Sequence, residues 1–385
     1  MHIGFTGPIS LAPLADRLGC RPPTTYAVPY TGLLAGTWLD QGHRVTVYAL
    51  GAVERPWVRT SGPLTVVVVP MRAHARHYLR DFFRVEREAL VREMHARPAD
   101  VISAHWTYEF ALAAARSGMP AFVTAHDAPL RCAWEEGLSP YRWLRNTLAV
   151  PAVHRATALS GVSPYTARHL RRVLRAPVPV RVIPNGVRLA GMPSAPPPAA
   201  TAAPVFATVL NGWGPLKNGQ AALRAFGLTR SRLPAARLLM FGEGFQPDGT
   251  AAAWAAGQGL TEGVEFVGPT GHGELLERLA AEATALVHPS RLEACPMILL
   301  EAMAVGVPVL AGRRSGAVPW VLDEGRAGVL VDIDSPREIA DAMVELGRST
   351  ALRTRLAAAG RSRVHRHFDL DTVADTYTRW FRTAA

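Results

Sequence analysis

The stretch that decides the fold runs from His288 to Ala311 and reads His-Pro-Ser-Arg-Leu-Glu-Ala-Cys-Pro-Met-Ile-Leu-Leu-Glu-Ala-Met-Ala-Val-Gly-Val-Pro-Val-Leu-Ala. An apolar run ends at Val287, directly before this stretch, and Pro296 suits the first turn of a helix. Gly306 and Pro308 then stop the helix ahead of another apolar run. The stretch therefore predicts a strand, a loop, a helix and a second strand.

Similar apolar runs, separated by helix-like segments, recur along the whole chain. Those of the first half are Ile3–Phe5, Val45–Ala49, Val66–Val69, Val101–Ser103, Ala121–Thr124 and Ala158–Val162. Those of the second half are Val205–Leu210, Arg237–Phe241, Val264–Val267, Ala285–His288, Val307–Ala311 and Val329–Val331. Short, uninterrupted apolar strands between helices are typical of a parallel sheet covered on both faces. We therefore predict an α/β protein.

The length of 385 residues exceeds what one hydrophobic core usually supports, so we expect two domains. The proline- and alanine-rich segment 188–204 predicts a linker between a doubly wound, Rossmann-like domain over residues 1–187 and a second one over 205–365. Residues 366–385 are expected to end in a helix that packs back toward the first domain. Ligands of open α/β sheets bind beyond the carboxyl ends of the strands, so we expect a ligand in a cleft between the two domains.

The composition excludes several classes of protein. With 49% apolar and 19% charged residues the chain is not intrinsically disordered, and it has no run of about 20 uncharged apolar residues that would span a membrane. Its first residues do not resemble a secretion signal. The three cysteines, Cys20, Cys132 and Cys295, fit neither a disulfide framework nor a metal site of the Cys-x-x-Cys type. A reducing, cytoplasmic location is therefore expected.

The net charge of +11 predicts attraction to an anionic partner, which could be nucleic acid, an acidic membrane surface or a phosphorylated small molecule. The positive charge is almost entirely arginine, and compositional drift in a GC-rich genome is the alternative explanation. The chain has no RNP-like, KH-like or zinc-finger pattern, so we do not expect nucleic acid as a partner.

Two carboxylates flank the predicted start of the helix in the deciding stretch. The backbone N–H groups near Met297 and Ile298, together with the helix dipole, form a ready phosphate site. Glu293 lies in the loop ahead of them, and Glu301 lies one turn below Met297 on the same face. A carboxylate can accept hydrogen bonds from the vicinal hydroxyls of a ribose or a pyranose. The alternative is that both are ordinary solvated acids, but Glu301 lies in a segment that is apolar on nearly every side.

Two further residues are candidates because they follow predicted strands. Lys217 comes after the loop Asn211-Gly-Trp-Gly-Pro in a chain that is nearly free of lysine, and a solvated surface lysine is the alternative. His126 follows the strand Ala121–Thr124, and the alternative is a capping or core histidine.

The deciding stretch resembles the Glu-x7-Glu motif of retaining GT-B glycosyltransferases, in particular glycosyltransferase family 4. The motif itself, Glu293 to Glu301 followed by Gly306-Val-Pro-Val, is specific. The resemblance extends over most of the chain, through Gly42-His-Arg-Val45, Ala125-His-Asp127, Pro184-Asn-Gly-Val187, Lys217-Asn-Gly219, Phe241-Gly-Glu-Gly244 and Gly316-Ala-Val-Pro319. It implies a GT-B fold, with two Rossmann-like domains that face each other across a cleft.

The resemblance also implies roles for individual residues. Glu293 would contact hydroxyls of the donor sugar near the reacting carbon, and Glu301 would bind the ribose of the nucleotide. Lys217 would bind the diphosphate, and His126 would line the sugar from the opposite domain. The turn Cys295, Pro296, Met297 and Ile298 would hold the sugar and the diphosphate, and Gly212 and Trp213 stand in the loop before the lysine, where relatives commonly have an arginine.

The function implied is the transfer of a sugar from a nucleoside diphosphate to an acceptor hydroxyl, with retention of anomeric configuration. A lysine and a helix N-terminus would stabilise the leaving diphosphate, so neither a metal nor a cofactor is expected. The alternative within this architecture is a sugar-nucleotide epimerase or hydrolase. Two Asp-x-Asp sequences, Asp332-Ile-Asp334 and Asp369-Leu-Asp371, are interpreted as chance matches to a metal motif of other glycosyltransferases.

The sequence departs from the family pattern at two places. The first loop, Gly7–Thr25, is longer than usual and lacks the common glycine pair, so acceptor specificity is expected there. Trp320 stands where an acid is common.

The segment Met71–Arg97 carries many arginines among apolar residues. Its acids favour a partly buried helix with a solvated face. The alternative is an amphipathic helix that binds the anionic inner face of a membrane and brings the enzyme to a lipid-linked acceptor.

Overall fold

The computed structural model describes residues 1–26, 28–135, 140–194 and 203–383. The chain divides into two compact units. Unit 1 comprises Met1–Gly186 and Leu370–Ala385, and unit 2 comprises Val187–Asp369. Of the predicted linker, residues 195–202 lie outside the described residues, as do residues 384–385 of the predicted C-terminal segment.

Unit 1 contains an eight-stranded sheet in the order β3-β4-β2-β1-β5-β6-β7-β8. Every pair of neighbouring strands is parallel except β3 and β4, which are antiparallel. The strands are β1 (His2–Thr6), β2 (Arg44–Gly51), β3 (Trp57–Ser61), β4 (Leu64–Pro70), β5 (Val101–His105), β6 (Ala121–Ala125), β7 (Ala158–Gly161) and β8 (Val180–Val182).

The two edge strands, β3 and β8, were not among the predicted strands. β3 is mostly exposed and β8 has only three residues, so neither forms an uninterrupted apolar run. The strands between them are almost fully buried, as expected for a sheet covered on both faces.

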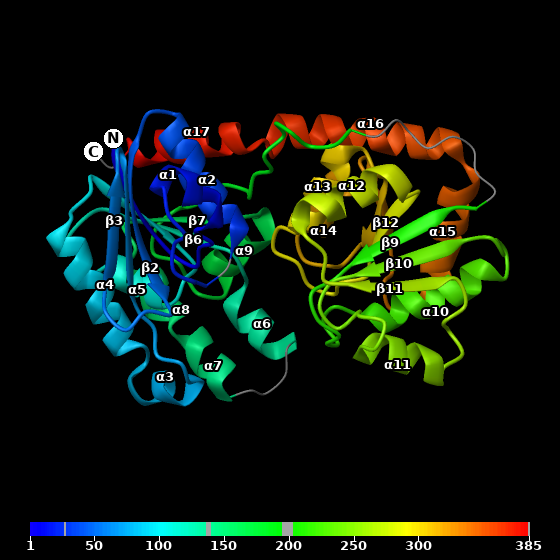
Figure 1. The fold of residues 1–385 in the computed structure, drawn as a ribbon, viewed down its shortest axis with the longest axis horizontal. Helices are drawn as coiled ribbons and strands as arrows, with labels where there is room; N and C mark the ends of the chain where they lie inside the picture. The colour runs from blue at the N-terminus through cyan, green and yellow to red at the C-terminus, as the bar shows by residue number, and fades with distance from the viewer. Residues whose placement is uncertain (27, 136–139, 195–202, 384–385) are drawn as a thin grey trace. The chain divides into compact units, whose positions relative to one another are not determined.

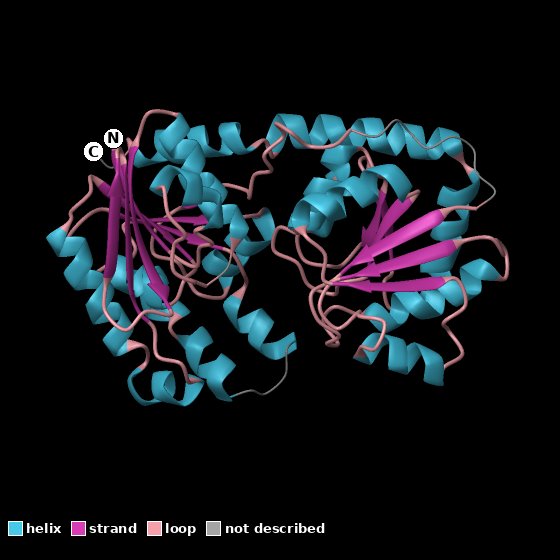
Figure 2. Cartoon of the chain, in the orientation of Figure 1, coloured by secondary structure: helices cyan, strands magenta, loops and turns pink. Residues whose placement is uncertain are grey.

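Helices cover both faces of the unit 1 sheet, as Figures 1 and 2 show. The helices are α1 (Ala15–Leu18), α2 (Pro29–Asp40), α3 (Ala75–Asp81), α4 (Arg84–Ala96), α5 (Glu109–Ala114), α6 (Pro129–Glu135), α7 (Pro140–Thr147), α8 (Ala149–Arg155), α9 (Pro164–Arg172) and α17 (Leu370–Phe381), with a short 3-10 turn, η1 (Ala12–Leu14).

The last helix, α17, packs within unit 1 against α2. Trp38 of α2 is fully buried and lies edge-on to Tyr377 and Phe381, with ring centroids 5.9 and 5.8 Å apart. Its indole N–H donates a hydrogen bond to the carbonyl of Ala374 at 3.4 Å. Trp380 meets Phe122 of β6 edge-on at 4.8 Å. Because each aromatic side chain buries a large apolar area, α17 is an integral part of the unit 1 core.

Unit 2 is a six-stranded, wholly parallel sheet in the order β11-β10-β9-β12-β13-β14. Its strands are β9 (Val205–Val209), β10 (Arg237–Phe241), β11 (Val264–Gly268), β12 (Ala285–His288), β13 (Val309–Gly312) and β14 (Val329–Val331). Its helices are α10 (Gly219–Arg230), α11 (Thr250–Gly257), α12 (His272–Glu282), α13 (Met297–Val305), α14 (Val318–Val321), α15 (Pro336–Arg348) and α16 (Thr350–His367), with a 3-10 turn, η2 (Asp323–Gly325).

The helices of unit 2 lie on two sides of its sheet, with α10 and α11 on one and α12 and α13 on the other (Figure 1). Two parallel-sheet α/β units confirm the predicted fold class. The chain order reverses at β9, which lies between β10 and β12. In open α/β sheets such a reversal opens a crevice at the carboxyl ends of the strands. The loops that follow β9 and β12 therefore meet at one place, and they carry Lys217 and Glu293.

No helix in the described part of the chain is long and apolar enough to cross a membrane. The apolar residues of the basic segment Met71–Arg97 are largely accounted for by core packing, since Tyr78, Phe83, Leu90 and Met94 are buried. Phe82 and Val85 are exposed, at 42% and 50%. The partly buried helix that the sequence favours corresponds to α4. Contact of this segment with a membrane stays a prediction.

Candidate active site

Unit 2 contains a pocket of about 440 Å³ at the carboxyl ends of its strands. Five of the residues singled out from the sequence line it, namely Lys217, Glu293, Pro296, Met297 and Ile298. The remaining wall includes Leu210 after β9, Gly242 and Glu243 after β10, Thr270 before α12 and His288 at the end of β12. The crevice predicted by the strand order is thus a pocket lined by two acids, a histidine and a lysine.

The loop before α10 is held in place by the loop after β12. The backbone N–H of Arg291 donates to the carbonyl of Leu216 at 2.9 Å, and its guanidinium donates to the carbonyl of Pro215. On the other side, Asn218 adopts a left-handed conformation (φ 55°) and donates from its side chain to the carbonyl of Ile333 at 2.9 Å. Lys217, which is the only lysine in the sequence, is thereby fixed beside Glu293.

Glu293 is the best-connected carboxylate of the pocket. Its Oε1 accepts hydrogen bonds from Nζ of Lys217 at 2.8 Å and from Nε2 of His288 at 3.2 Å. Its side chain is only 15% exposed. Burial alone would raise the pKa of Glu293, but the hydrogen bond from His288 and the charge of Lys217 outweigh it and hold the pKa well below the usual 4.5. Glu293 is therefore ionised over the whole physiological range.

The start of α13 supplies hydrogen-bond donors to the same pocket. Pro296 is the N-cap, and the first amides of a helix have no partner inside it, which here are those of Met297 and Ile298. The positive end of the helix dipole lies at the same place. The pocket therefore combines one ammonium group with a helix N-terminus, an arrangement suited to a phosphate or diphosphate.

The loop behind Glu293 needs a glycine. Gly316 has φ 63°, and a Cβ at this position would lie 2.3 Å from the carbonyl oxygen of Glu293. The next residue, Ala317, donates its N–H to that carbonyl at 2.8 Å. Only a glycine lets the backbone at residue 316 approach Glu293 this closely, and this contact fixes the backbone position of Glu293 beside the pocket.

Glu301 and the loop residues Gly212, Trp213 and Cys295 do not line this pocket. Oε1 of Glu301 lies 2.8 Å from Nε2 of His272, at the start of α12, and this contact raises the pKa of His272. Trp213 packs against Phe245 and Trp254, with ring centroids 5.6 and 5.5 Å apart. Cys295 is buried.

His288 was missed as a functional candidate because it reads as the last residue of an apolar strand. In the structure it is 3% exposed, it lines the pocket and it binds Glu293. An ionised carboxylate only accepts hydrogen bonds, so Nε2 of His288 carries the hydrogen. Its other ring nitrogen, Nδ1, is buried without a partner among the described residues. A polar residue at the carboxyl end of an apolar strand was the available signal.

His126 lies in unit 1, directly after β6. Its Nε2 is 2.8 Å from Nδ1 of His105, which ends β5 and is fully buried. The ring of Trp106 stacks on His126, with centroids 4.9 Å apart. Burial lowers the pKa of His126 to about 3, and burial together with His126 lowers that of His105 well below its usual value. Both imidazoles are therefore neutral hydrogen-bonding groups near pH 7.

Neither Asp-x-Asp sequence lines the pocket. Asp332 pairs with Arg314, and Asp334 pairs with Arg291. Over the described ranges no group of three or more His, Cys, Asp or Glu side chains could hold a metal ion.

Two family models match the chain, and together they cover most of it. Residues 28–190 match the model described as Glycosyltransferase Family 4, and residues 203–349 match that described as Glycosyl transferases group 1. The chain belongs to glycosyltransferase family 4. This confirms the family that the sequence resembles.

Curated relatives resemble this family 4 chain over part of their length. It is 41% identical over 95 residues to a D-inositol 3-phosphate glycosyltransferase of Nocardioides, which covers 25% of the chain and 20% of that protein. It is 31% identical over 166 residues to a GDP-mannose-dependent alpha-(1-6)-phosphatidylinositol monomannoside mannosyltransferase of Mycobacterium tuberculosis, which covers 42% of the chain and 43% of that protein. The matched region thus spans less than half of the length of either relative.

The GT-B architecture of family 4 is confirmed by a likeness to solved structures. Sucrose-phosphate synthase from Thermosynechococcus elongatus superposes with a TM-score of 0.78 over 100% of this chain and 98% of that one. The sequence identity of 18% makes this a likeness of fold.

Proposed function

We propose that this protein transfers a sugar from a nucleoside diphosphate donor to an acceptor hydroxyl, with retention of anomeric configuration and without a metal. The observation that carries the proposal is the pairing of Lys217 with Glu293 in a pocket that also receives the N-terminus of α13. A cation and a helix N-terminus fit the diphosphate, and a buried carboxylate beside them fits the sugar.

The geometry supports a distinct part for each group. Lys217 and the amides of Met297 and Ile298 would stabilise the charge that develops on the leaving diphosphate. Lys217 and His288 both bind Oε1 of Glu293, which leaves Oε2 to accept a hydrogen bond from a sugar hydroxyl. Glu301 would bind the ribose in exchange for its contact with His272.

His126 would contribute as a neutral group. With a pKa of about 3 it is a poor proton acceptor near pH 7, so its part would be to donate or accept a hydrogen bond to a substrate hydroxyl while His105 fixes its ring. The relatives named above act with GDP-mannose or on inositol derivatives according to their names, and a nucleotide sugar is the class of donor that we propose here.

A panel of UDP- and GDP-sugars tests the proposal. Release of nucleoside diphosphate should depend on one donor class and rise when a hydroxyl acceptor is added, and the NMR coupling constant of the product's anomeric proton should match that of the donor. A product of inverted configuration would refute retention. Release that does not respond to acceptors would indicate a hydrolase, and conversion of the donor sugar into its epimer would indicate an epimerase.

A further inference from the structure

Unit 1 contains a second cavity, of about 620 Å³, whose walls are aromatic. Its lining includes Tyr26, Tyr78, Phe83, Trp106 and Tyr108, together with His126. It lies where β5 and β6 end, since Trp106 follows β5 and His126 follows β6. The cavity is therefore at the edge of the sheet where a ligand is expected.

The backbone is strained at two of the aromatic residues in this wall. Trp106 has φ 70° and Phe83 has φ 61°, a left-handed conformation that is unfavourable for a bulky side chain. In return Trp106 stacks on His126, and Phe83 stacks on Tyr78 with centroids 4.4 Å apart and an interplanar angle of 5°. Backbone strain thus coincides with the placement of flat rings around the cavity.

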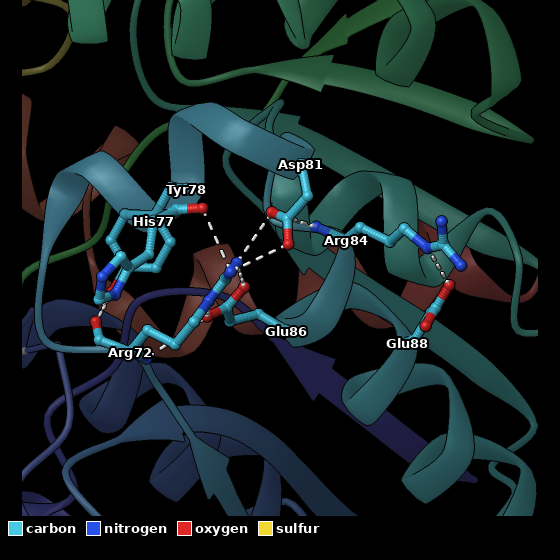
Figure 3. A network of polar contacts seen from close by, with 7 residues as sticks. All are labelled: Arg72, His77, Tyr78, Asp81, Arg84, Glu86 and Glu88. Carbon is cyan, nitrogen blue, oxygen red and sulfur yellow. Dashed lines mark hydrogen bonds and ion pairs between the residues drawn. The ribbon is translucent and has the colours of Figure 1, made fainter.

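Of the two arginines in the described part of the wall, Arg72 is fully engaged (Figure 3). Its Nε and one terminal nitrogen donate to the buried carboxylate of Glu86 at 2.7 and 2.6 Å. Both terminal nitrogens donate to Asp81 at 2.9 Å, and one also donates to the carbonyl of His77 at 3.2 Å. A guanidinium has five N–H groups, and these contacts use all five. Arg72 therefore has no hydrogen bond left for an incoming anion.

The guanidinium carbon of the second arginine, Arg145, lies over the ring of Tyr108, 4.6 Å from its centroid, and two of its nitrogens donate to Glu109 at 3.0 and 3.4 Å. Asp127 adds another carboxylate to the lining. Among the described side chains that line the cavity or bind its arginines, the acids Asp81, Glu86, Glu109 and Asp127 outnumber the two guanidinium groups. This balance repels a phosphate and tolerates a neutral or cationic group.

We infer that this cavity is the acceptor subsite for a ring without phosphate, which stacks on the indole of Trp106. That the bound ring is an acceptor rests on the proposed glycosyl transfer. The preference for a ring without phosphate follows from the cavity alone. Aromatic faces bind the apolar face of a sugar or cyclitol ring, and Asp127 and His126 are placed to bind its hydroxyl groups.

Three matched probes test the inference without any donor present. They are phenyl β-D-glucopyranoside, its 6-phosphate and its 6-amino-6-deoxy analogue, with affinity for the full chain measured by ligand-observed NMR. The neutral and amino probes should bind at millimolar concentration, and the phosphate should bind at least roughly tenfold more weakly, as expected for one unfavourable charge contact of about 1.4 kcal/mol. Tighter binding of the phosphate, or binding of none of the three, overturns the inference.

Two glycine substitutions separate the loss of stacking from damage to the fold. Trp106→Gly removes the indole and suits the left-handed backbone, so the neutral probe should bind roughly tenfold more weakly in a folded protein. Phe82→Gly is the matched control, because Phe82 also has a positive φ, of 53°, but is exposed and does not line the cavity. Unchanged binding by Trp106→Gly refutes the stacking role.

Release of nucleoside diphosphate from the donor panel is measured on the same protein in parallel. Probe binding without donor turnover would refute the proposed function and leave the cavity's preference standing. Turnover that requires a phosphorylated acceptor would refute the inference and leave the proposed function standing.

Discussion

Nζ of Lys217 lies 2.8 Å from Oε1 of Glu293, so the only lysine of the chain is paired with the central carboxylate of the unit 2 pocket. In this arrangement each charge compensates the other. A bound diphosphate would offer Lys217 a stronger partner and would free Glu293 for the sugar. Binding of the diphosphate at Lys217 would therefore favour binding of the sugar at Glu293.

Replacement of Glu293 by glutamine should lower turnover by roughly two powers of ten or more, since an amide cannot stabilise positive charge near the reacting carbon. Affinity for nucleoside diphosphate should change little. Glu277→Gln, on the exposed face of α12, is the control and should retain full turnover. Both are read from initial rates on protein whose unfolding temperature has been checked. Full activity of Glu293→Gln would remove the main residue of the proposed mechanism.

Replacement of Glu301 by alanine should instead weaken the binding of nucleoside diphosphate by about 1.5 to 3 kcal/mol, the range for hydrogen bonds to a charged group. His272→Ala should cost much less, because that side chain is 63% exposed and its ion pair is worth little in water. Titration calorimetry with UDP and GDP measures both. Equal losses in the two variants would mean that Glu301 acts only through His272.

The contact between His288 and Glu293 predicts a change in pH dependence. His288→Leu removes a hydrogen bond that lowers the pKa of Glu293, so that pKa should rise. If the ionised carboxylate is the active form, the acid limb of the turnover profile should move to higher pH. His288→Gln retains an N–H donor and should restore much of the original profile. A profile that is the same in all three proteins would show that His288 only fills space.

Removal of metal ions should leave activity intact. Lys217 and the N-terminus of α13 are proposed to stabilise the leaving diphosphate, which is the part that Mg²⁺ plays in metal-dependent enzymes. Turnover is therefore expected to be unchanged after dialysis against EDTA, and added Mg²⁺ should not raise it. Loss of activity in chelator that Mg²⁺ restores would refute the metal-free mechanism.

The buried pair His105 and His126 predicts acid sensitivity of unit 1. Both pKa values are lowered in the folded protein, so the unfolded chain binds more protons below pH 6.5. Stability should be at its full value above this pH and should fall as the pH drops toward 3, by about a factor of ten in the folding equilibrium constant per pH unit for His126 and in the same direction for His105. His126→Phe should make this fall shallower, and His95→Gln, on an exposed position, should not. Urea unfolding at several pH values measures the slope.

The sequence by itself determined the fold class and the elements of the unit 2 pocket. Buried parallel strands are continuous apolar runs, so the interior strands of unit 1 and the strands of unit 2 could be located in the sequence, and the proline and glycine around α13 marked its ends. The spacing from Glu293 to Glu301 also identified the family. These features are local, since each depends on residues close together in the chain.

Only the tertiary structure decided which of those residues share a pocket. Glu301 contacts His272, and Trp213 packs against Phe245. Each of these contacts joins residues about 30 positions apart in the sequence, and no hydrophobic periodicity predicts such a pairing. The edge strands β3 and β8 form by hydrogen bonding to β4 and β7, which already belong to the sheet. They therefore need no apolar run of their own. The contact of His288 with Glu293 and the strained stack of Trp106 on His126 likewise depend on side-chain packing, because the geometry of a loop is set by what it packs against rather than by its own propensity.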